Sequence, residues 1–108
     1  MTFGKAIDSR RHARTKTSHA IEFAIGNGTP RPGICRDMSL GGLQIETQEP
    51  APFGADVNIF IELKGIAGPT QLRGVVRWTK PGIMGVQLGS FGARVTHAII
   101  AMLGDHER

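Results

Sequence analysis

Short runs of alternating apolar and polar residues, separated by glycine and proline, constrain the fold of this chain more than any other feature. The clearest run is residues 56–64 (D-V-N-I-F-I-E-L-K), in which Val57, Ile59, Ile61 and Leu63 alternate with polar or outward positions. A period of two places these apolar side chains on one face of a β-strand. Because such runs recur along most of the chain, the sequence predicts an all-β fold with a small α contribution.

Five further runs are typical of strands, and segments that contain glycine or proline separate them. The longest run holds Gly74, which predicts a bend or a β-bulge within that strand. The six predicted strands cover residues 17–25, 33–38, 43–47, 56–64, 70–79 and 83–88. Six short strands joined by tight turns predict a small antiparallel β-barrel.

The hydrophobic period changes after the last predicted strand. Ser90 is the expected N-cap, and apolar residues then recur at helical spacing at Val95, Ile99, Met102 and Leu103. This pattern predicts one C-terminal helix that ends near Gly104. We expect its apolar stripe to pack against an open end of the sheet.

The net charge of +4 is concentrated at the N-terminus. Residues 1–16 carry five basic residues and one acidic residue, whereas residues 17–108 carry eight of each. We therefore divide the chain into a flexible basic arm (1–16), a barrel with its helix (17–104) and a tail (105–108). A basic arm on a neutral body favours a local anion site or a nucleic-acid tail, although a solubilising terminus has the same composition.

Several classes of protein are disfavoured by the sequence. No stretch reaches the roughly 20 apolar residues of a membrane helix, and the N-terminus lacks the apolar segment of a signal peptide. Cys35 is the single cysteine, so we expect a core residue and no intrachain disulfide. A cytoplasmic protein without membrane insertion is expected. The scattered histidines and the lack of a catalytic or Walker pattern predict no metal site and no enzymatic activity.

Two clusters carry the functional signal. The first is R-R-H-A-R, which begins at Arg10, and the second is D-M-S-L-G-G, which begins at Asp37 at a tight turn between predicted strands. Guanidinium groups pair with phosphates and with the O6/N7 edge of guanine, while a carboxylate accepts hydrogen bonds from the opposite guanine edge. Together the clusters predict a site for a guanine nucleotide.

The second cluster has two interpretations that the sequence leaves open. Asp37 and Ser39 are two residues apart, so they share a face on an extended backbone and a planar ligand could meet both. Gly41 and Gly42 lack a Cβ atom and permit close approach to the main chain. The same pattern is also typical of an Asx or Ser turn, in which the side chains cap local amides.

The two clusters, in this order and among six predicted strands, resemble the PilZ domain family. The matches are R-x-x-x-R from Arg10 to Arg14 and D-x-S-x-x-G from Asp37 to Gly42, and the segments G-V-V-R-W and M-G-V-Q-L are similar to the closing strands of the family. The resemblance covers nearly the whole chain and implies a six-stranded PilZ-type barrel. It also implies a bacterial receptor for cyclic di-GMP, a second messenger, in the regulation of motility or exopolysaccharide.

The resemblance assigns roles to residues of both clusters. Arg10 and Arg14 would clamp guanine and phosphate, and Asp37 and Ser39 would read the guanine edge. Gly42, with Gly41 beside it, would allow close approach of the ligand. Members of the family bind one ligand or an intercalated pair, and the short residue that precedes the arginine motif here leaves the stoichiometry open.

Two residues outside these motif positions are further candidates for ligand binding. Arg11 is an additional cation, either in contact with a phosphate or exposed. Trp78 either stacks on a purine from the rim of the barrel or is a buried aromatic of the sheet. We interpret Arg36 and Arg77 as charges on the strand surface.

The sequence-based hypothesis is a receptor in which cyclic di-GMP draws the basic arm onto the barrel. Because the chain shows no effector domain, an unidentified partner protein would read the change. One alternative is a PilZ-like adaptor that does not respond to nucleotide. A second, less favoured alternative is a small basic barrel that binds RNA or single-stranded DNA, but the body is neutral and lacks the interleaved aromatic residues of that class.

Overall fold

The computed structural model describes the backbone of residues 15–107 and the side chains of residues 17–102. Its elements are β1 (Thr15–Ile25), β2 (Arg31–Met38), β3 (Gly42–Glu46), β4 (Asp56–Glu62), β5 (Pro69–Lys80), β6 (Ile83–Leu88) and α2 (Ala93–Glu107). The prediction of a six-stranded β-barrel with a C-terminal helix is therefore confirmed. The predicted arginine cluster, Arg10, Arg11 and Arg14, lies outside the described residues.

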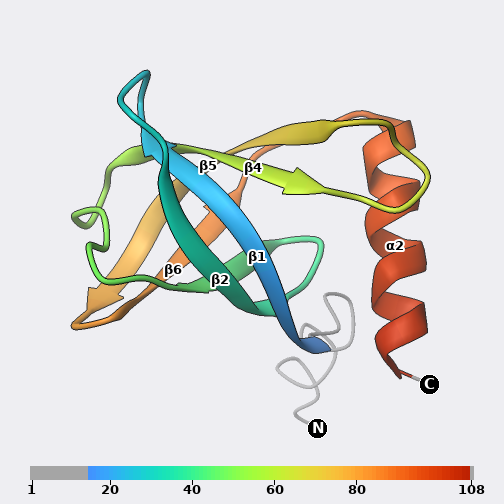
Figure 1. Cartoon of the computed structure of the whole chain (residues 1–108), viewed down its shortest axis with the longest axis horizontal. Coiled ribbons are helices and arrows are strands. Elements are labelled where there is room, and N and C mark those ends of the chain that lie inside the picture. The colour runs from blue at the N-terminus through green and yellow to red at the C-terminus, as the bar shows by residue number, and fades with distance from the viewer. Residues whose placement is uncertain (1–14, 108) are drawn as a thin grey trace, which may run out of the picture.

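The strands close into a barrel in the order β1-β2-β3-β6-β5-β4, and all neighbours are antiparallel. Loops of six residues or fewer join most consecutive strands, and the longer loop from β3 to β4 crosses one end of the barrel (Figure 1). The β5–β6 turn is P-G at Pro81 and Gly82, and Gly82 has a φ of 82°. Only glycine adopts such a φ without strain, so this turn pairs β5 with β6 in register.

Alternating apolar side chains from all six strands fill the interior of the barrel. The fully buried ones include Phe23, Cys35, Ile45, Ile59, Val76 and Met84, each with no exposed surface. The expectation that Cys35 is a core residue is confirmed. Burial of each large apolar side chain contributes about 1.5–3 kcal/mol, so this interior supplies most of the stabilisation of the fold.

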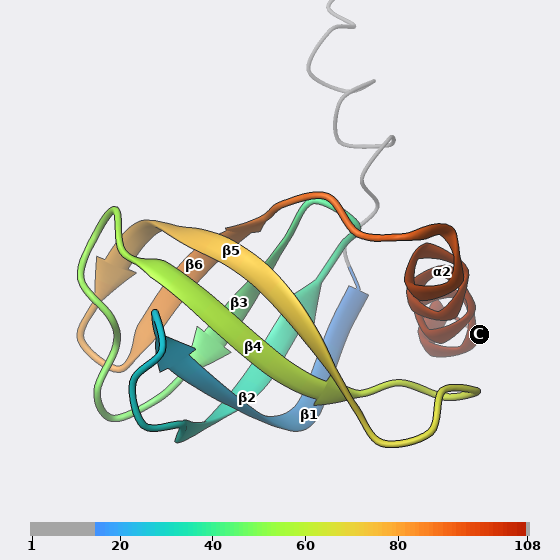
Figure 2. The same ribbon diagram turned by 90° about the horizontal axis from the view of Figure 1, so that it is seen from above.

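Helix α2 lies against the end of the barrel opposite the β3–β4 loop (Figures 1 and 2). Its buried side chains are Ala98, Ile99 and Met102. The prediction of Ser90 as the N-cap is wrong, because the first helical bond runs from the amide of Thr96 to the carbonyl oxygen of Gly92 at 3.0 Å. The helix also continues to Glu107, beyond the expected end near residue 104.

Strand β5 contains a register shift between Val76 and Trp78. The shift follows Gly74, where the sequence predicts a bend or bulge, but it does not occur at that glycine. Gly74 instead leaves room for the neighbouring strand, because a Cβ atom there would lie 2.5 Å from Cγ1 of Val86. The shift itself changes which side of the barrel the following residues face. Within the described residues, no helix has the length and hydrophobicity needed to cross a bilayer.

Candidate functional site

The turn between β2 and β3 is organised by the hydroxyl group of Ser39. Its Oγ atom accepts hydrogen bonds from the amides of Gly41 and Gly42, both at 3.2 Å. The amide of Ser39 donates to the carbonyl oxygen of Gly42 at 2.9 Å. Because only 1% of Ser39 is exposed, this hydroxyl caps the turn, as the Ser-turn interpretation predicts.

The two glycines of the turn hold β3 against the end of β6. The carbonyl oxygen of Gly41 accepts a hydrogen bond from the amide of Leu88 at 2.9 Å. A Cβ atom on Gly42 would lie 2.5 Å from the carbonyl oxygen of Val86, where a real side chain has no room. The absence of a side chain at Gly42 therefore serves the packing of two strands, apart from any role in ligand binding.

Trp78 lies on the outside of the barrel. It is 36% exposed, so the interpretation of Trp78 as a buried aromatic is wrong. Val76 faces the core, and regular alternation would turn Trp78 inward too, but the register shift between them turns the indole outward. The ring rests on Gly85 of β6, and the ammonium group of Lys80 lies 5.6 Å from its centroid.

Four of the predicted site residues surround one shallow depression, which we call the turn hollow. It has a volume of about 230 Å³ and is lined by Ser39, Gly41, Gly42, Leu43, Gln44, Arg77, Trp78, Gly85, Val86 and Gln87. Nε of Arg77 donates a hydrogen bond to Oε1 of Gln87 at 2.6 Å. Arg77 is the one charged residue of this lining, so the turn hollow is cationic.

Asp37 lies beside the turn hollow and does not line it. Its Cα atom pairs with Lys16 on β1 and with Gln44 on β3. The residue is half-buried, and its Oδ1 atom is shielded from solvent. A register shift between Cys35 and Asp37 interrupts the alternation of β2. The side chain of Asp37 therefore does not follow that of Cys35 into the core. The structure thus brings Ser39 and Trp78 together at the turn hollow, and Asp37 lies next to it, paired with Gln44 of the lining.

The chain enters the barrel beside the same turn. Thr15, the first described residue, pairs with Met38, and Arg14 directly precedes it in sequence. Four peptide units separate Arg10 from Arg14, and an extended chain advances at most about 3.6 Å per residue. The described chain thus begins next to this turn, and the R-x-x-x-R motif itself lies outside the described residues.

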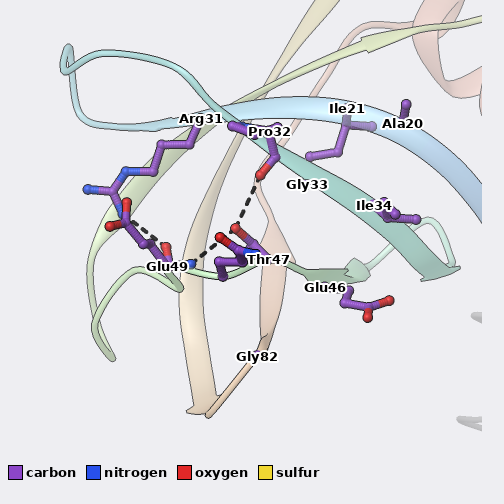
Figure 3. A pocket seen from close by; sticks show the side chains of 11 residues that line it. Ala20, Ile21, Arg31, Pro32, Gly33, Ile34, Glu46, Thr47, Glu49 and Gly82 are labelled. Atoms are coloured by element: carbon purple, nitrogen blue, oxygen red, sulfur yellow. Dashed lines mark hydrogen bonds between the residues drawn. The ribbon is translucent and has the colours of Figure 1, made fainter.

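A larger depression, the strand hollow, is lined by residues of β1 and β2, by the end of β3 and by the loop that follows it, and is shown in Figure 3. It measures about 690 Å³ and includes none of the predicted site residues. Its polar groups bond to one another: Oγ1 of Thr47 donates to the carbonyl oxygen of Pro32 at 3.1 Å and accepts from the amide of Glu49 at 3.4 Å. Arg31 donates to the carbonyl oxygen of Glu49 at 2.9 Å. These contacts fix the β3–β4 loop.

The comparisons with known proteins decide the family. The PilZ domain model matches residues 8–103 of this chain. The chain belongs to the PilZ domain family. PilZ domains are receptor and adaptor domains without catalytic activity, and the family generally binds cyclic di-GMP. The family match covers both of the motifs that carry the resemblance in the sequence.

Two solved structures share this fold. The PilZ domain of CeSA, from a cellulose-synthesizing bacterium, superposes with a TM-score of 0.70 at 19% identity, over 88% of this chain and 98% of that chain. The inhibitor of motility MotI/DgrA of Bacillus subtilis superposes with a TM-score of 0.70 at 17% identity, over 91% of this chain. This PilZ domain spans about half of the MotI/DgrA chain, at 51%. No curated protein sequence matches significantly.

Six residues of the turn hollow were not predicted from the sequence, and two of them, Gly85 and Arg77, determine its shape and its charge. The indole ring of Trp78 packs on Gly85. Arg77, which the sequence analysis interprets as a charge on the strand surface, lines the same depression. Only the pairing of Trp78 with Gly85 across β5 and β6 reveals both roles, and that register is not visible in the sequence. Among the described side chains, no group of three or more His, Cys, Asp or Glu residues could hold a metal ion.

Proposed function

We propose that this PilZ domain is a receptor for cyclic di-GMP, which binds over the turn hollow and against the N-terminal arginine motif. The observation that carries the proposal is the position of the turn hollow, at the point where the chain from Arg14 enters the barrel. Arg10 and Arg14 would bind guanine and phosphate, and Arg11 would add a further phosphate contact. The ligand would be a signal, and no cofactor is required.

The chemistry of the turn hollow supports a nucleotide with a purine base and a phosphate. Trp78 presents an aromatic surface that is partly exposed, and a purine stacks favourably on such a ring. Arg77 is planar and carries five N–H donors, of which one goes to Gln87, so it can also bind a phosphate oxygen. Asp37, which pairs with Gln44 of the lining, would accept hydrogen bonds from a guanine edge.

The size of the turn hollow explains why the arginine motif is needed. Its volume of about 230 Å³ is below the roughly 300–1,000 Å³ typical of sites that enclose a small molecule. A dinucleotide would therefore project from the surface and require a second wall. Charge-assisted hydrogen bonds of about 1.5–3 kcal/mol each would offset the cost of holding the N-terminal segment over the ligand.

The output of this receptor would pass to another protein. Closure of a cationic segment over a dianionic ligand changes both the shape and the charge of one side of the barrel. A partner that contacts this side would distinguish the bound form from the free form. Regulation of motility or of exopolysaccharide is the process that the family resemblance favours.

Isothermal titration calorimetry of the full chain with cyclic di-GMP tests the proposal, with GMP as the control ligand. We expect saturable binding at micromolar protein, a change in Trp78 fluorescence, and little binding of GMP. An absence of heat and of any fluorescence change would contradict the receptor function and favour the adaptor that does not respond to nucleotide. Tight, salt-dependent binding of an unrelated oligonucleotide would instead favour the nucleic-acid alternative.

A further inference from the structure

Strands β1 and β4 pair along only part of their length. The Cα partners on β4 extend from Glu22 to Ile25 of β1, whereas β2 pairs with β1 from Thr15 to Phe23. The last residues of β4 continue to pair with β5 on their other side. Figure 1 shows β1 and β4 adjacent near the end of β1 and diverging toward its beginning. Within the described chain, residues 19–21 therefore pair with β2 alone, and Ser18 beside them lies in the register shift between Lys16 and His19.

The open side of β1 carries backbone groups that can form hydrogen bonds. In an antiparallel sheet, alternate residues direct their N–H and C=O groups to opposite sides of the strand. Residues 19–21 pair with β2 in unbroken register, so at least one of them directs these groups away from β2. Within the described chain, residues 18–21 form no backbone hydrogen bond with β4 or with a loop. Such an edge is a template for another extended chain.

A depression of about 690 Å³ follows this open edge, and we call it the β1–β4 seam. It is lined by Ser18, His19, Ala20, Ile21, Glu22, Pro32, Phe60, Glu62 and Pro69. Consecutive β1 residues contribute, although neighbours on a strand point to opposite faces. A hollow confined to one face would meet only alternate residues, so this hollow runs along the edge of the strand.

The rim of the β1–β4 seam is acidic. Glu22 and Glu62 line it, and no lysine or arginine does. Both glutamates are exposed, and neither forms an ion pair within the described part of the chain. The apolar groups of Ala20, Phe60 and Pro69 also line the seam. Basic and apolar side chains in alternation would therefore complement this surface.

We propose that the β1–β4 seam binds an extended basic segment of a partner protein, which adds to β1 as a further strand. Residues 18–21 offer an edge of about 14 Å, enough for a strand of roughly four residues. The lining of the β1–β4 seam shares no residue with the lining of the turn hollow, so the partner and the proposed nucleotide have separate contact residues. The inference rests on the partner-signalling part of the proposed function and is independent of nucleotide binding.

Selection of random dodecapeptides displayed on phage against the immobilised full chain tests this proposal. We expect enriched peptides in which lysine or arginine alternates with apolar residues. Titration of the best peptide into the labelled protein should shift the amide resonances of residues 18–21. A selection without enrichment, or peptides whose shifts map to the turn hollow or the strand hollow, would overturn the proposal.

Charge variants test the chemistry of the rim. The double variant Glu22→Lys/Glu62→Lys should weaken binding of the best peptide by about tenfold or more, because two attractions become repulsions. Glu49→Lys reverses an exposed charge outside the seam and should leave the affinity within about twofold. If the double variant fails to fold, Glu22→Gln and Glu62→Gln test the same charges. Equal affinity of the rim variants and Glu49→Lys would refute the proposal.

Two other occupants of the seam give distinct results. If residues 1–14 of this chain occupied it, amides of residues 18–21 would exchange slowly in the free full chain and show NOE contacts to that segment. If a second copy occupied it, the same amides would shift with protein concentration, and ultracentrifugation would detect a dimer. Either result would overturn assignment of the seam to a partner protein. If the rim variants still bind cyclic di-GMP, a failure of the partner-binding proposal leaves the nucleotide proposal intact.

Discussion

The indole ring of Trp78 packs directly on the backbone of Gly85, its cross-strand partner on β6. A Cβ atom at Gly85 would collide with Nε1 of the ring, so the glycine determines how close the ring lies to the barrel. This contact orients the exposed ring face beside the turn between β2 and β3. An aromatic group that is already held in place loses little conformational entropy when a base stacks on it.

We expect Gly85→Ala to displace Trp78 and to weaken cyclic di-GMP binding. The new methyl group has no room under the indole, so the ring must rotate outward, at a cost of about 1–3 kcal/mol in unfolding free energy. The emission of Trp78 should shift toward that of an exposed tryptophan. Urea unfolding followed by the same fluorescence measures the loss of unfolding free energy. Gly89→Ala is the control, because its Cβ atom would make only an ordinary contact at 3.6 Å. An unchanged emission spectrum in Gly85→Ala would contradict the packing described.

Ser39→Ala should destabilise the protein even without ligand. The substitution removes the acceptor of two amide hydrogen bonds inside a buried turn, which costs about 1–3 kcal/mol. Chemical denaturation measures this loss, and calorimetry should show a parallel loss of nucleotide affinity as the turn loosens. Ser90→Ala, at an exposed position, should change neither quantity. A fully stable Ser39→Ala protein that only binds nucleotide less tightly would show that the hydroxyl acts on the ligand and not on the turn.

Gly42→Ala should be more damaging than its place in a turn suggests. Its Cβ atom would lie 2.5 Å from the carbonyl oxygen of Val86, so β3 and β6 must separate at the point where they close the barrel. We expect a loss of about 3 kcal/mol in unfolding free energy, measured by urea denaturation. The matched control is Gly92→Ala, where a Cβ atom meets nothing within 4 Å. Equal stability of the two variants would be incompatible with this close approach.

Arg14→Ala should remove most of the affinity for cyclic di-GMP and leave the thermal midpoint of unfolding unchanged. Arg14 precedes the first described strand residue, and the core is built from residues of the barrel and α2. Loss of a charge-assisted hydrogen bond to phosphate costs about 1.5–3 kcal/mol, or roughly tenfold to a hundredfold in the dissociation constant. Lys5→Ala removes one positive charge outside the motif and serves as the control in calorimetry. Unfolding of Arg14→Ala, or equal effects of the two substitutions, would refute the proposed role.

Much of the fold is predictable because burial follows a local pattern. The alternation of Val57, Ile59 and Ile61 indicates both a strand and its buried face, and all three are in the core. The helix is predictable from its spacing, but its ends are not. The sequence predicts the N-cap at Ser90, but the first helical hydrogen bond is accepted by Gly92. The packing of α2 on the barrel determines where the first helical turn begins.

The candidate site is less predictable because it combines residues from four strands. The D-x-S-x-x-G turn is a local signal, and the turn forms where the sequence predicts it. Asp37 lies near the end of β2 and is only half-buried. Ser39 is instead buried in the turn, where its hydroxyl accepts hydrogen bonds from the amides of Gly41 and Gly42. Arg77 belongs to the turn hollow only because β5 pairs with β6 and β6 pairs with β3.

The sequence by itself determined the six strands, the helix, the composition of the core and the position of the turn, because each depends on side chains that are near one another along the chain. Tertiary structure alone decided that Trp78 faces outward and rests on Gly85. Simple alternation after Val76 would bury that ring, and the register shift that exposes it arises from the pairing of β5 with β6 in a closed barrel. The same closure leaves residues 19–21 of β1 paired with β2 and not with β4, since β4 diverges from them.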